Sequence, residues 1–354
     1  MDYWLSCAKC GKSYPSSYRG QTCAVCGGIL EVEYKGTVRK SIAGARSFWD
    51  LEPLLPKGEY KHFEVGMTKL MASHESSKLF FKLEFENPTR SFKDRGSVVE
   101  VAKAKEYGYN KIVCASTGNM AYSIAYYAKL YGIEASVFIS RSANKDKLVD
   151  IKSTHDAELH MINGDFTRAQ GDAEVYAKKS KAFLAGDYCY RKEGQATIAY
   201  ELLVQRPSLK NIIVPVGNAT LFSALFKAYA LLQKARMVKE LPKLIGVEAA
   251  GCPPIYNAMK HGSEIKYIRP HTYADAIAVG FPTYGSEAVY AVNQTGGMFM
   301  VVSDAQMKAQ QEWFYNEYGI KIELASAAGI AAYRKLGKAI RNEETAIILT
   351  GANV

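Results

Sequence analysis

Short apolar segments alternate with stretches of helical periodicity from Leu79 to the end of the chain, and this alternation constrains the fold more than any other feature. The clearest helical stretches run up to Tyr107 and from Asn119 to Tyr131. Because two parallel strands need a long crossover between them, usually a helix, the alternation predicts parallel sheets wrapped by helices. The expected strands span residues 79–85, 111–115, 134–139, 158–162, 211–216, 244–247, 299–302 and 346–349, with an earlier one at 30–34.

The composition is that of a folded, water-soluble protein. The 354 residues suffice for about two domains, and 48% hydrophobic with 23% charged residues is typical of neither disordered nor membrane proteins. Lys and Arg exceed Asp and Glu by 45 to 35, but the charges are interspersed, which favours small anionic ligands over nucleic acid. Apolar segments are only strand-sized and the first residues lack a signal pattern, so we expect no membrane association and a cytoplasmic protein.

Four of the seven cysteines lie within the first 26 residues, as the pairs Cys7 and Cys10 and Cys23 and Cys26, each with two residues between its members. Two such pairs can place four thiolates around one Zn²⁺ ion. All four positions of the metal are then taken by protein ligands, so the zinc is expected to be structural. Two disulfides are the first alternative, disfavoured in a reducing cytoplasm, and a redox pair is the second.

The loops that follow the predicted strands are where parallel folds of this kind bind ligands. The first loop, residues 86–96, carries Lys93 at the start of a helix. A lysine there opposes the helix macrodipole, which disfavours its charged form and suits an amine that acts as a nucleophile. On spacing alone, a solvated surface lysine is favoured over a nucleophile.

Three further loops have small or hydroxyl residues at strand ends. In the second loop, Ser116, Thr117, Gly118 and Asn119 open a helix, and Ser or Thr is expected to cap it. The third loop, residues 217–221, also runs directly into a helix and can close on an anion; a plain tight turn is the alternative. The fourth is Thr350-Gly351, at the end of the last strand.

In order and spacing, these motifs resemble the threonine synthase family of fold-type II pyridoxal phosphate enzymes, and the cysteine ribbon is similar to that of the archaeal members. The likeness covers nearly the whole chain and implies an α/β fold with two open, mostly parallel sheets. It also implies a zinc ribbon at 1–35, a large cofactor-binding domain at 36–90 and 186–354, and a small mobile domain at 91–185. The motifs are Ser91-Phe92-Lys93-Asp94-Arg95-Gly96, Ala115-Ser116-Thr117-Gly118-Asn119, Pro215-Val216-Gly217-Asn218-Ala219, Thr350-Gly351, Glu193-Gly194-Gln195 and residues 322–328.

The resemblance also implies roles for individual residues. Lys93 would form a Schiff base with pyridoxal phosphate, Thr350 would face the pyridine nitrogen, and Asn119 would contact the ring hydroxyl. Arg191 would bind a substrate phosphate. The remaining cofactor ligands would be Phe92, Val216, Gly217, Asn218, Ala219, Thr220 and Leu221, and the substrate carboxylate or its neighbouring groups would lie against Ser116, Thr117 and Gly118.

The function implied is that of a homodimeric lyase of amino-acid biosynthesis, which would convert O-phosphohomoserine and water to threonine and phosphate. Two departures lie on the substrate side. Lys69 replaces the family's proline in the motif at 66–70, and residues 185–190 lack the family's asparagine-serine pair before Arg191. The altered stretch at 185–190 favours, as an alternative, β-replacement on another activated amino acid such as O-phosphoserine, as in cysteate synthases. A zinc-ribbon binding protein on an inactive scaffold is the third hypothesis.

Overall fold

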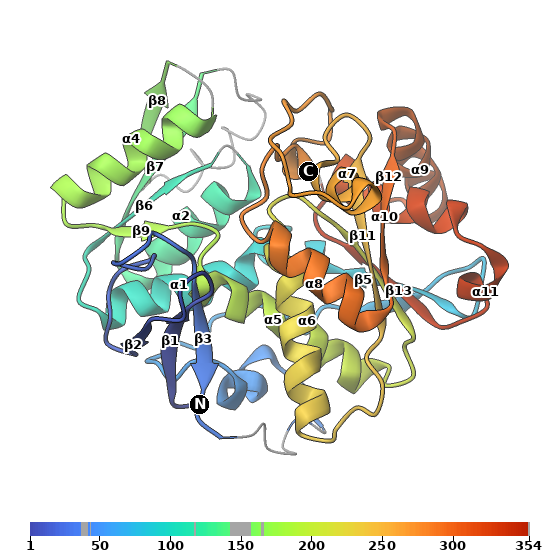
Figure 1. Cartoon of the computed structure of the whole chain (residues 1–354), viewed down its shortest axis with the longest axis horizontal. Helices are drawn as coiled ribbons and strands as arrows, with labels where there is room; N and C mark the ends of the chain where they lie inside the picture. The colour runs from blue at the N-terminus through green and yellow to red at the C-terminus, as the bar shows by residue number, and fades with distance from the viewer. Residues whose placement is uncertain (37–41, 43, 117, 142–156, 164–165, 353–354) are drawn as a thin grey trace. The chain divides into compact units, whose positions relative to one another are not determined.

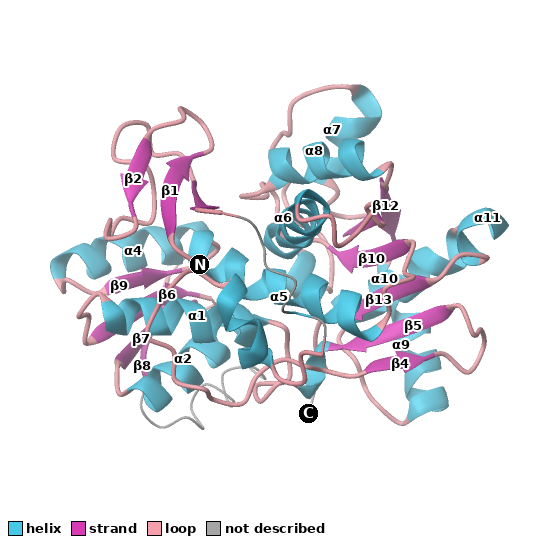
Figure 2. Ribbon diagram, turned by 90° about the horizontal axis from the view of Figure 1, so that it is seen from below, coloured by secondary structure: helices cyan, strands magenta, loops and turns pink. Residues whose placement is uncertain are grey.

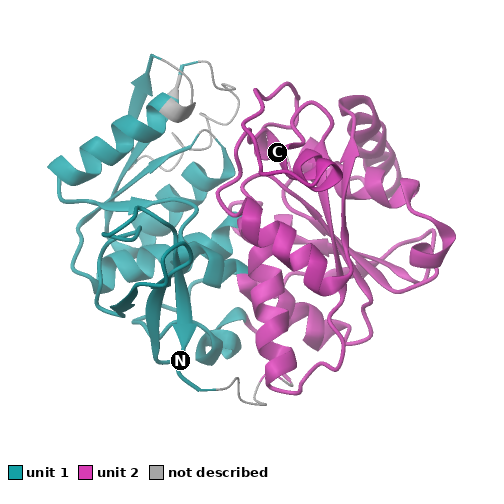
Figure 3. Ribbon diagram, in the orientation of Figure 1, with its two compact units in different colours: residues 1–37, 48–65, 93–195 teal, residues 38–47, 66–92, 196–354 magenta. Residues whose placement is uncertain are grey.

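The chain divides into two compact units (Figure 3). The structure is a computed structural model that describes residues 1–36, 42, 44–116, 118–141, 157–163 and 166–352 (Figure 1). Unit 1 comprises Met1–Thr37, Phe48–Val65 and Lys93–Gln195, and unit 2 comprises Val38–Ser47, Gly66–Phe92 and Ala196–Val354. Among the described residues, no helix has both the length and the apolar character that crossing a membrane requires. The three-domain division expected from the sequence stays a prediction.

Unit 2 is built on a six-stranded sheet with the order β12-β11-β10-β13-β5-β4, drawn in magenta in Figure 2. The first five strands of this order run parallel, and β4 pairs antiparallel with β5 at the edge. Continuous burial of β5, β10 and β13 matches their uninterrupted apolar sequences. The strands are β4 (Leu70–Ala72), β5 (Leu79–Leu83), β10 (Asn211–Pro215), β11 (Lys243–Ala249), β12 (Met298–Val302) and β13 (Thr345–Leu349).

Helices cover this sheet and close its core. Helix α10 packs against β10, β11 and β13, and α9 packs on α10. Helices α6 and α8 both contact β11 and each other. A capping box formed by Ser303 and Gln306 begins α9. The helices are α6 (Thr220–Lys234), α7 (Pro254–His261), α8 (Gly285–Thr295), α9 (Asp304–Tyr318), α10 (Leu324–Lys335) and α11 (Lys338–Arg341), with 3-10 turns η2 (Phe48–Leu54, in unit 1), η3 (Glu84–Glu86) and η4 (Asp275–Ile277).

Unit 1 contains a parallel four-stranded sheet, β8-β7-β6-β9, and a small antiparallel sheet, β2-β1-β3. Helices α2 and α4 pack on the parallel sheet, on opposite sides of it in Figure 2, and α1 packs on α2. The elements are β1 (Tyr3–Cys7), β2 (Ser13–Pro15), β3 (Leu30–Tyr34), α1 (Lys93–Glu106), β6 (Lys111–Ala115), α2 (Asn119–Tyr131), β7 (Glu134–Ser140), β8 (Ala157–Ile162), α4 (Phe166–Lys179), β9 (Phe183–Ala185) and α5 (Cys189–Gln205), the last shared with unit 2.

The predicted fold class is confirmed: two mostly parallel sheets are wrapped by helices, beside a small cysteine ribbon. All nine expected strands form. Their bounds differ most at β11, which is longer than expected at both ends, and at β5, which ends at Leu83 because the chain then turns into η3. Four strands were not predicted. Three of them, β2, β4 and β9, have only three residues each and no room for a periodic pattern, and β1 lies within the cysteine ribbon.

A buried ion pair joins strand β5 and helix α5 within unit 2. Lys82 and Glu201 have fully buried side chains, and their Nζ and Oε2 atoms lie 2.6 Å apart. Lys82 also donates to the carbonyl of Thr68 at 2.6 Å, and Oε1 of Glu201 accepts from the backbone N–H of Met67 at 2.7 Å. Both charges therefore have hydrogen-bond partners inside the unit, which is the condition for burying them at all.

This network predicts that Glu201→Gln lowers the free energy of unfolding by about 3–5 kcal/mol, because the amide keeps the bond from Met67 but leaves the buried ammonium of Lys82 uncompensated. The double variant Lys82→Met with Glu201→Gln is expected to regain most of this loss. Urea unfolding at pH 7 measures both. Glu240→Gln, which breaks an exposed pair with Lys210, is the control and should change stability by less than about 1 kcal/mol. Equal losses in the single and double variants would contradict the prediction.

Candidate active site

The carboxyl ends of β10 and β13 meet at one edge of the unit 2 sheet, because the two strands are parallel neighbours. Residues 217–221 follow β10 and run into α6, which begins at Thr220. Its N-cap residue is Ala219, in the left-handed region at φ 60°, and no side chain caps the helix start. A helix start carries N–H groups without intrahelical partners and the positive end of the macrodipole, so this loop can bind an anion.

The shape of this loop is set by the segment that contains η4 and the start of α8. A Cβ atom at Gly217 would lie 2.7 Å from the carbonyl oxygen of Ala276, so only glycine fits without displacing the loop. The carbonyl of Asn218 accepts from the N–H of Tyr284 at 3.0 Å. Its side-chain oxygen accepts from the hydroxyl of Thr283 at 3.3 Å. The loop is therefore held in place before any ligand arrives.

Thr350 lies at the end of β13 and is held by Ser326 of α10. The two hydroxyl oxygens are 3.2 Å apart, and either can donate. The same Ser326 oxygen accepts from the N–H of Gly351 at 2.9 Å. Thr350 is 6% exposed, so its hydroxyl is a buried, neutral group at a fixed position.

The chain that leads into Lys93 is tied to this same end of β13. The N–H of Phe92 donates to the carbonyl of Thr350 at 3.0 Å, and Ser91 forms an isolated antiparallel bridge with Gly351. Lys93 follows directly as the first residue of α1, as the sequence predicts, and its side chain is half-buried.

In unit 1, the carboxyl ends of β6 and β9 also meet at one edge, since these strands are parallel neighbours. Asn119 begins α2 and, like Ser116 and Gly118, is partly exposed. The predicted capping by a hydroxyl is wrong for the described residues: Gly118 is the N-cap, and no side chain caps the helix. The Ser116 hydroxyl instead accepts from the N–H of Gly118 at 3.4 Å, a bond within the loop. Thr117 lies outside the described residues.

Arg191 is fully buried and bonded within unit 1. Its Nη2 atom lies 2.5 Å from Oε2 of Glu100, and its Nε atom donates to the carbonyl of Gly186 at 2.9 Å. Both terminal nitrogens also lie within 3.4 Å of the Ser97 hydroxyl. Burial raises the pKa of the Glu100 carboxyl group, while Arg191 and the N–H of Gly186 oppose this rise. The positive charge of the Arg191 guanidinium is thus already paired with the carboxylate of Glu100.

Helix spacing relates this pair to Lys93. Ser97 and Glu100 lie four and seven residues after Lys93, so the three share one face of α1, and Ser97 is about 6 Å further along the axis. The backbones of α1 and α5 are also in close contact: a Cβ atom at Gly194 would lie 2.0 Å from the carbonyl oxygen of Arg95. Neither Ser97 nor Glu100 was predicted from the sequence. Their spacing from Lys93 was the signal that could have found them.

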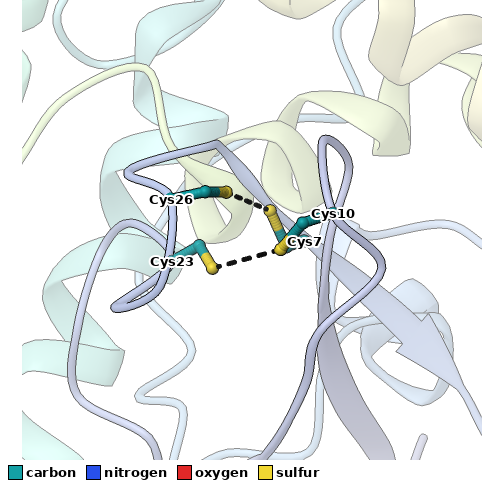
Figure 4. A group of neighbouring side chains, drawn as sticks. All are labelled: Cys7, Cys10, Cys23 and Cys26. Atoms are coloured by element: carbon teal, nitrogen blue, oxygen red, sulfur yellow. Dashed lines mark hydrogen bonds between the residues drawn. The ribbon is translucent and has the colours of Figure 1, made fainter.

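The four predicted metal ligands are brought together in the ribbon (Figure 4). The sulfur atoms of Cys7, Cys10, Cys23 and Cys26 all lie within 4.8 Å of one another. Cys7 and Cys26 are 3.5 Å apart and Cys10 and Cys23 are 3.6 Å apart. Zn–S bonds of about 2.3 Å in a tetrahedron would give S···S separations of about 3.8 Å. All four are free thiols, so the group has the donor chemistry and nearly the spacing of a zinc site.

Comparison with known proteins agrees with this geometry. Residues 62–351 match the family described as pyridoxal-phosphate dependent enzyme. The chain belongs to this family. It is 34% identical to a threonine synthase of Methanosarcina acetivorans, over 99% of this chain and 91% of that protein. It is 32% identical to a threonine synthase of Methanocaldococcus jannaschii, over 98% and 91%. The chain is therefore a pyridoxal-phosphate-dependent enzyme with threonine synthase relatives.

Solved structures share the fold. Maize serine racemase superposes with a TM-score of 0.72 at 25% identity, covering 81% of this chain and 88% of that one. The processed form of threonine deaminase isoform 2 from Solanum lycopersicum superposes with a TM-score of 0.69 at 21% identity, covering 81% and 84%. The expectation of a fold-type II enzyme is thus confirmed.

The close contact at Gly217 predicts the effect of Gly217→Ala on residues 217–221, called the anion loop below. The added methyl group must push the loop away from Ala276, so the dissociation constant for pyridoxal phosphate is expected to rise about tenfold or more. Absorbance titration of the cofactor-free enzyme measures it. The control is Gly171→Ala, at an exposed position of α4 with no atom within 4 Å of the added Cβ. A similar cofactor affinity in both variants would show that the loop does not bind the phosphate.

Proposed function

We propose that this enzyme catalyses elimination and replacement on an activated amino acid, and specifically converts O-phosphohomoserine and water to threonine and phosphate. The threonine synthase relatives, which match nearly the full chain, support the reaction type. The observation that carries the proposal is the bond between Phe92 and Thr350, which ties the residue before Lys93 to the sheet edge that also carries the anion loop. The loop at 217–221, the Thr350 hydroxyl and the Lys93 amine have the chemistry to bind the phosphate, the ring nitrogen and the aldehyde of pyridoxal phosphate.

The proposed cofactor site uses residues of unit 2 for the phosphate and the ring nitrogen. The uncapped start of α6 would bind the phosphate, through backbone groups from Val216 to Leu221, including Gly217, Asn218, Ala219 and Thr220. The Thr350 hydroxyl, held by Ser326, would meet the ring nitrogen without protonating it fully. When bound, pyridoxal phosphate supplies an electron sink for a carbanion at the substrate's α carbon.

Lys93 is proposed as the residue that binds the cofactor covalently and then moves protons at the α and β carbons of the substrate. Its place in the first turn of α1 disfavours the ammonium form, which favours the neutral amine that a base requires. Ser116, Gly118 and Thr117, the last outside the described residues, are proposed to bind the substrate carboxylate, and Asn119 the ring hydroxyl. Phosphate then leaves from the γ carbon. The protons removed from the α and β carbons pass to the γ carbon and to the released phosphate, and water adds its hydroxyl group at the β carbon and its remaining proton at the α carbon.

A second candidate, β-replacement on O-phosphoserine, is favoured by the surroundings of Arg191. In the first candidate Arg191 would bind the substrate phosphate, but its guanidinium is paired with Glu100 and fully buried. A phosphate beside this pair meets no net positive charge. O-Phosphoserine is one methylene group shorter, so its phosphate need not reach Arg191. Both candidate reactions use pyridoxal phosphate. The homodimer and the cytoplasmic location stay predictions in either case.

We also propose that the four clustered cysteines bind one structural zinc ion. Four thiolates leave the metal no open position for water or substrate. Metal analysis of the purified protein is expected to find about one zinc per chain. Cys23→Ser should lose most of it, whereas Cys252→Ser, at a cysteine outside the cluster, should keep it. Equal zinc contents in the two variants would contradict this site.

Product analysis decides between the two reactions. With O-phosphohomoserine, the first candidate predicts equal amounts of phosphate and threonine. Lys93→Ala should reduce turnover by about 10³-fold or more, and Lys105→Ala, at an exposed position of the same helix, is the control. If O-phosphohomoserine releases no phosphate but O-phosphoserine with sulfite does, the second candidate replaces the first. Substantial turnover by Lys93→Ala would remove Lys93 from its proposed role.

A further inference from the structure

The cysteine ribbon contacts the first turn of α5 at three points. The hydroxyl groups of Tyr3 and Tyr190 lie 3.1 Å apart. Lys192 donates to Glu31 at 2.7 Å, and Tyr34 donates to Glu193 at 2.5 Å. Residues 190, 192 and 193 are thus each bonded to the ribbon, while Arg191 between them bonds to α1. The turn that carries Arg191 is therefore held on two sides.

These contacts are too well buried to be incidental surface pairs. The side chains of Lys192 and Glu31 are 5% and 13% exposed, and an ion pair with so little solvent fixes a geometry more than it adds stability. The bond from Tyr34 ends on a carboxylate, which makes it one of the stronger kinds of hydrogen bond. A tyrosine from the end of α1 joins the cluster, since Tyr107 contacts the Tyr190 hydroxyl at 2.5 Å.

The two strands that carry these contacts lie next to the cysteine pairs in the sequence. Strand β1 ends at Cys7, and β3 begins at Leu30, four residues after Cys26. Tyr3 and Tyr34 are opposite each other in the β1–β3 ladder, and Cys7 is opposite Leu30. The four-cysteine cluster therefore lies at one end of the β1–β3 ladder, and the residues that contact α5 lie on the same two strands.

We propose that Tyr3, Glu31 and Tyr34 are positioning residues of the active site: through the first turn of α5 they hold Arg191 and the loop at Gly186 in place. The ribbon then controls the affinity for the amino-acid substrate. Affinity for the cofactor phosphate is left to the loop at 217–221 in unit 2. This rests on the proposed function only in placing Arg191 on the substrate side.

The test compares Tyr34→Phe and Glu31→Gln with two matched variants of the same ribbon. Tyr18→Phe removes a hydroxyl that bonds within the ribbon, to the carbonyl of Thr22, and Glu33→Gln changes a carboxylate that accepts from Ser6. Steady-state kinetics use O-phosphohomoserine, because its phosphate is the one proposed to reach Arg191. Amide hydrogen exchange of residues 186–195 in the cofactor-loaded enzyme measures how readily the start of α5 opens locally, independently of turnover.

Tyr34→Phe and Glu31→Gln are expected to raise KM about three- to tenfold while kcat changes less than about twofold. Exchange at 186–195 should become faster, and the dissociation constant for pyridoxal phosphate should stay unchanged. Tyr18→Phe and Glu33→Gln should match the parent enzyme in all of these. The charge exchange Glu31→Lys with Lys192→Glu should restore KM relative to Glu31→Lys alone, which a loss of general stability would not do.

Unchanged exchange at 186–195 in both Tyr34→Phe and Glu31→Gln would overturn the positioning role. Faster exchange with an unchanged KM would overturn the link from this turn to the substrate. If O-phosphohomoserine is not turned over, the proposed conversion to threonine fails, and the exchange measurement still decides whether the ribbon positions α5.

Discussion

The candidate active site depends on a short antiparallel contact between two distant parts of the chain. Ser91 bridges to Gly351, and Phe92 donates to the carbonyl of Thr350. This contact brings the segment before α1 to the end of β13, whose parallel neighbour β10 leads into the anion loop. Without it, the loop after β10 would remain an anion site, but the chain leading to Lys93 would not be fixed to the same edge. The place of Lys93, the proposed nucleophile, is thus set by backbone bonds, which do not depend on particular side chains.

Helix α5 contributes buried charges to both units. Arg191, near its start, pairs with Glu100 in unit 1, and Glu201, near its end, pairs with Lys82 in unit 2. Each pair has additional hydrogen bonds to backbone groups, so that neither charge is left without compensation. Such pairs favour one arrangement of the helices and strands that carry them. If these elements shifted apart, a buried charge would lose its partner, which costs free energy.

The sequence predicted the fold where the signal is local, whereas the roles of the site residues stay predictions. The strands at Leu30–Tyr34 and Lys111–Ala115 and the helix Asn119–Tyr131 have the predicted bounds, since each is a continuous or periodic apolar pattern. The four cysteines were found by spacing alone. In contrast, the expected cap of α2 by a Ser or Thr hydroxyl was wrong for the described residues, because propensity does not show where the backbone turns. Glu100 was missed because a glutamate within a helix looks like a surface residue until its partner, far away in sequence, is known.

Gly194 limits how specificity in this enzyme can change. Its backbone touches the carbonyl of Arg95 so closely that no larger residue fits, and α1 and α5 therefore cannot slide past each other without breaking this contact. The start of α1, which carries Lys93, and the first turns of α5, which carry Arg191, are therefore held in close backbone contact. If Arg191 lies on the substrate side, as proposed, a change of substrate would come from exchanging side chains such as those at positions 97 and 100, which bond to Arg191, while the two backbones stay in contact.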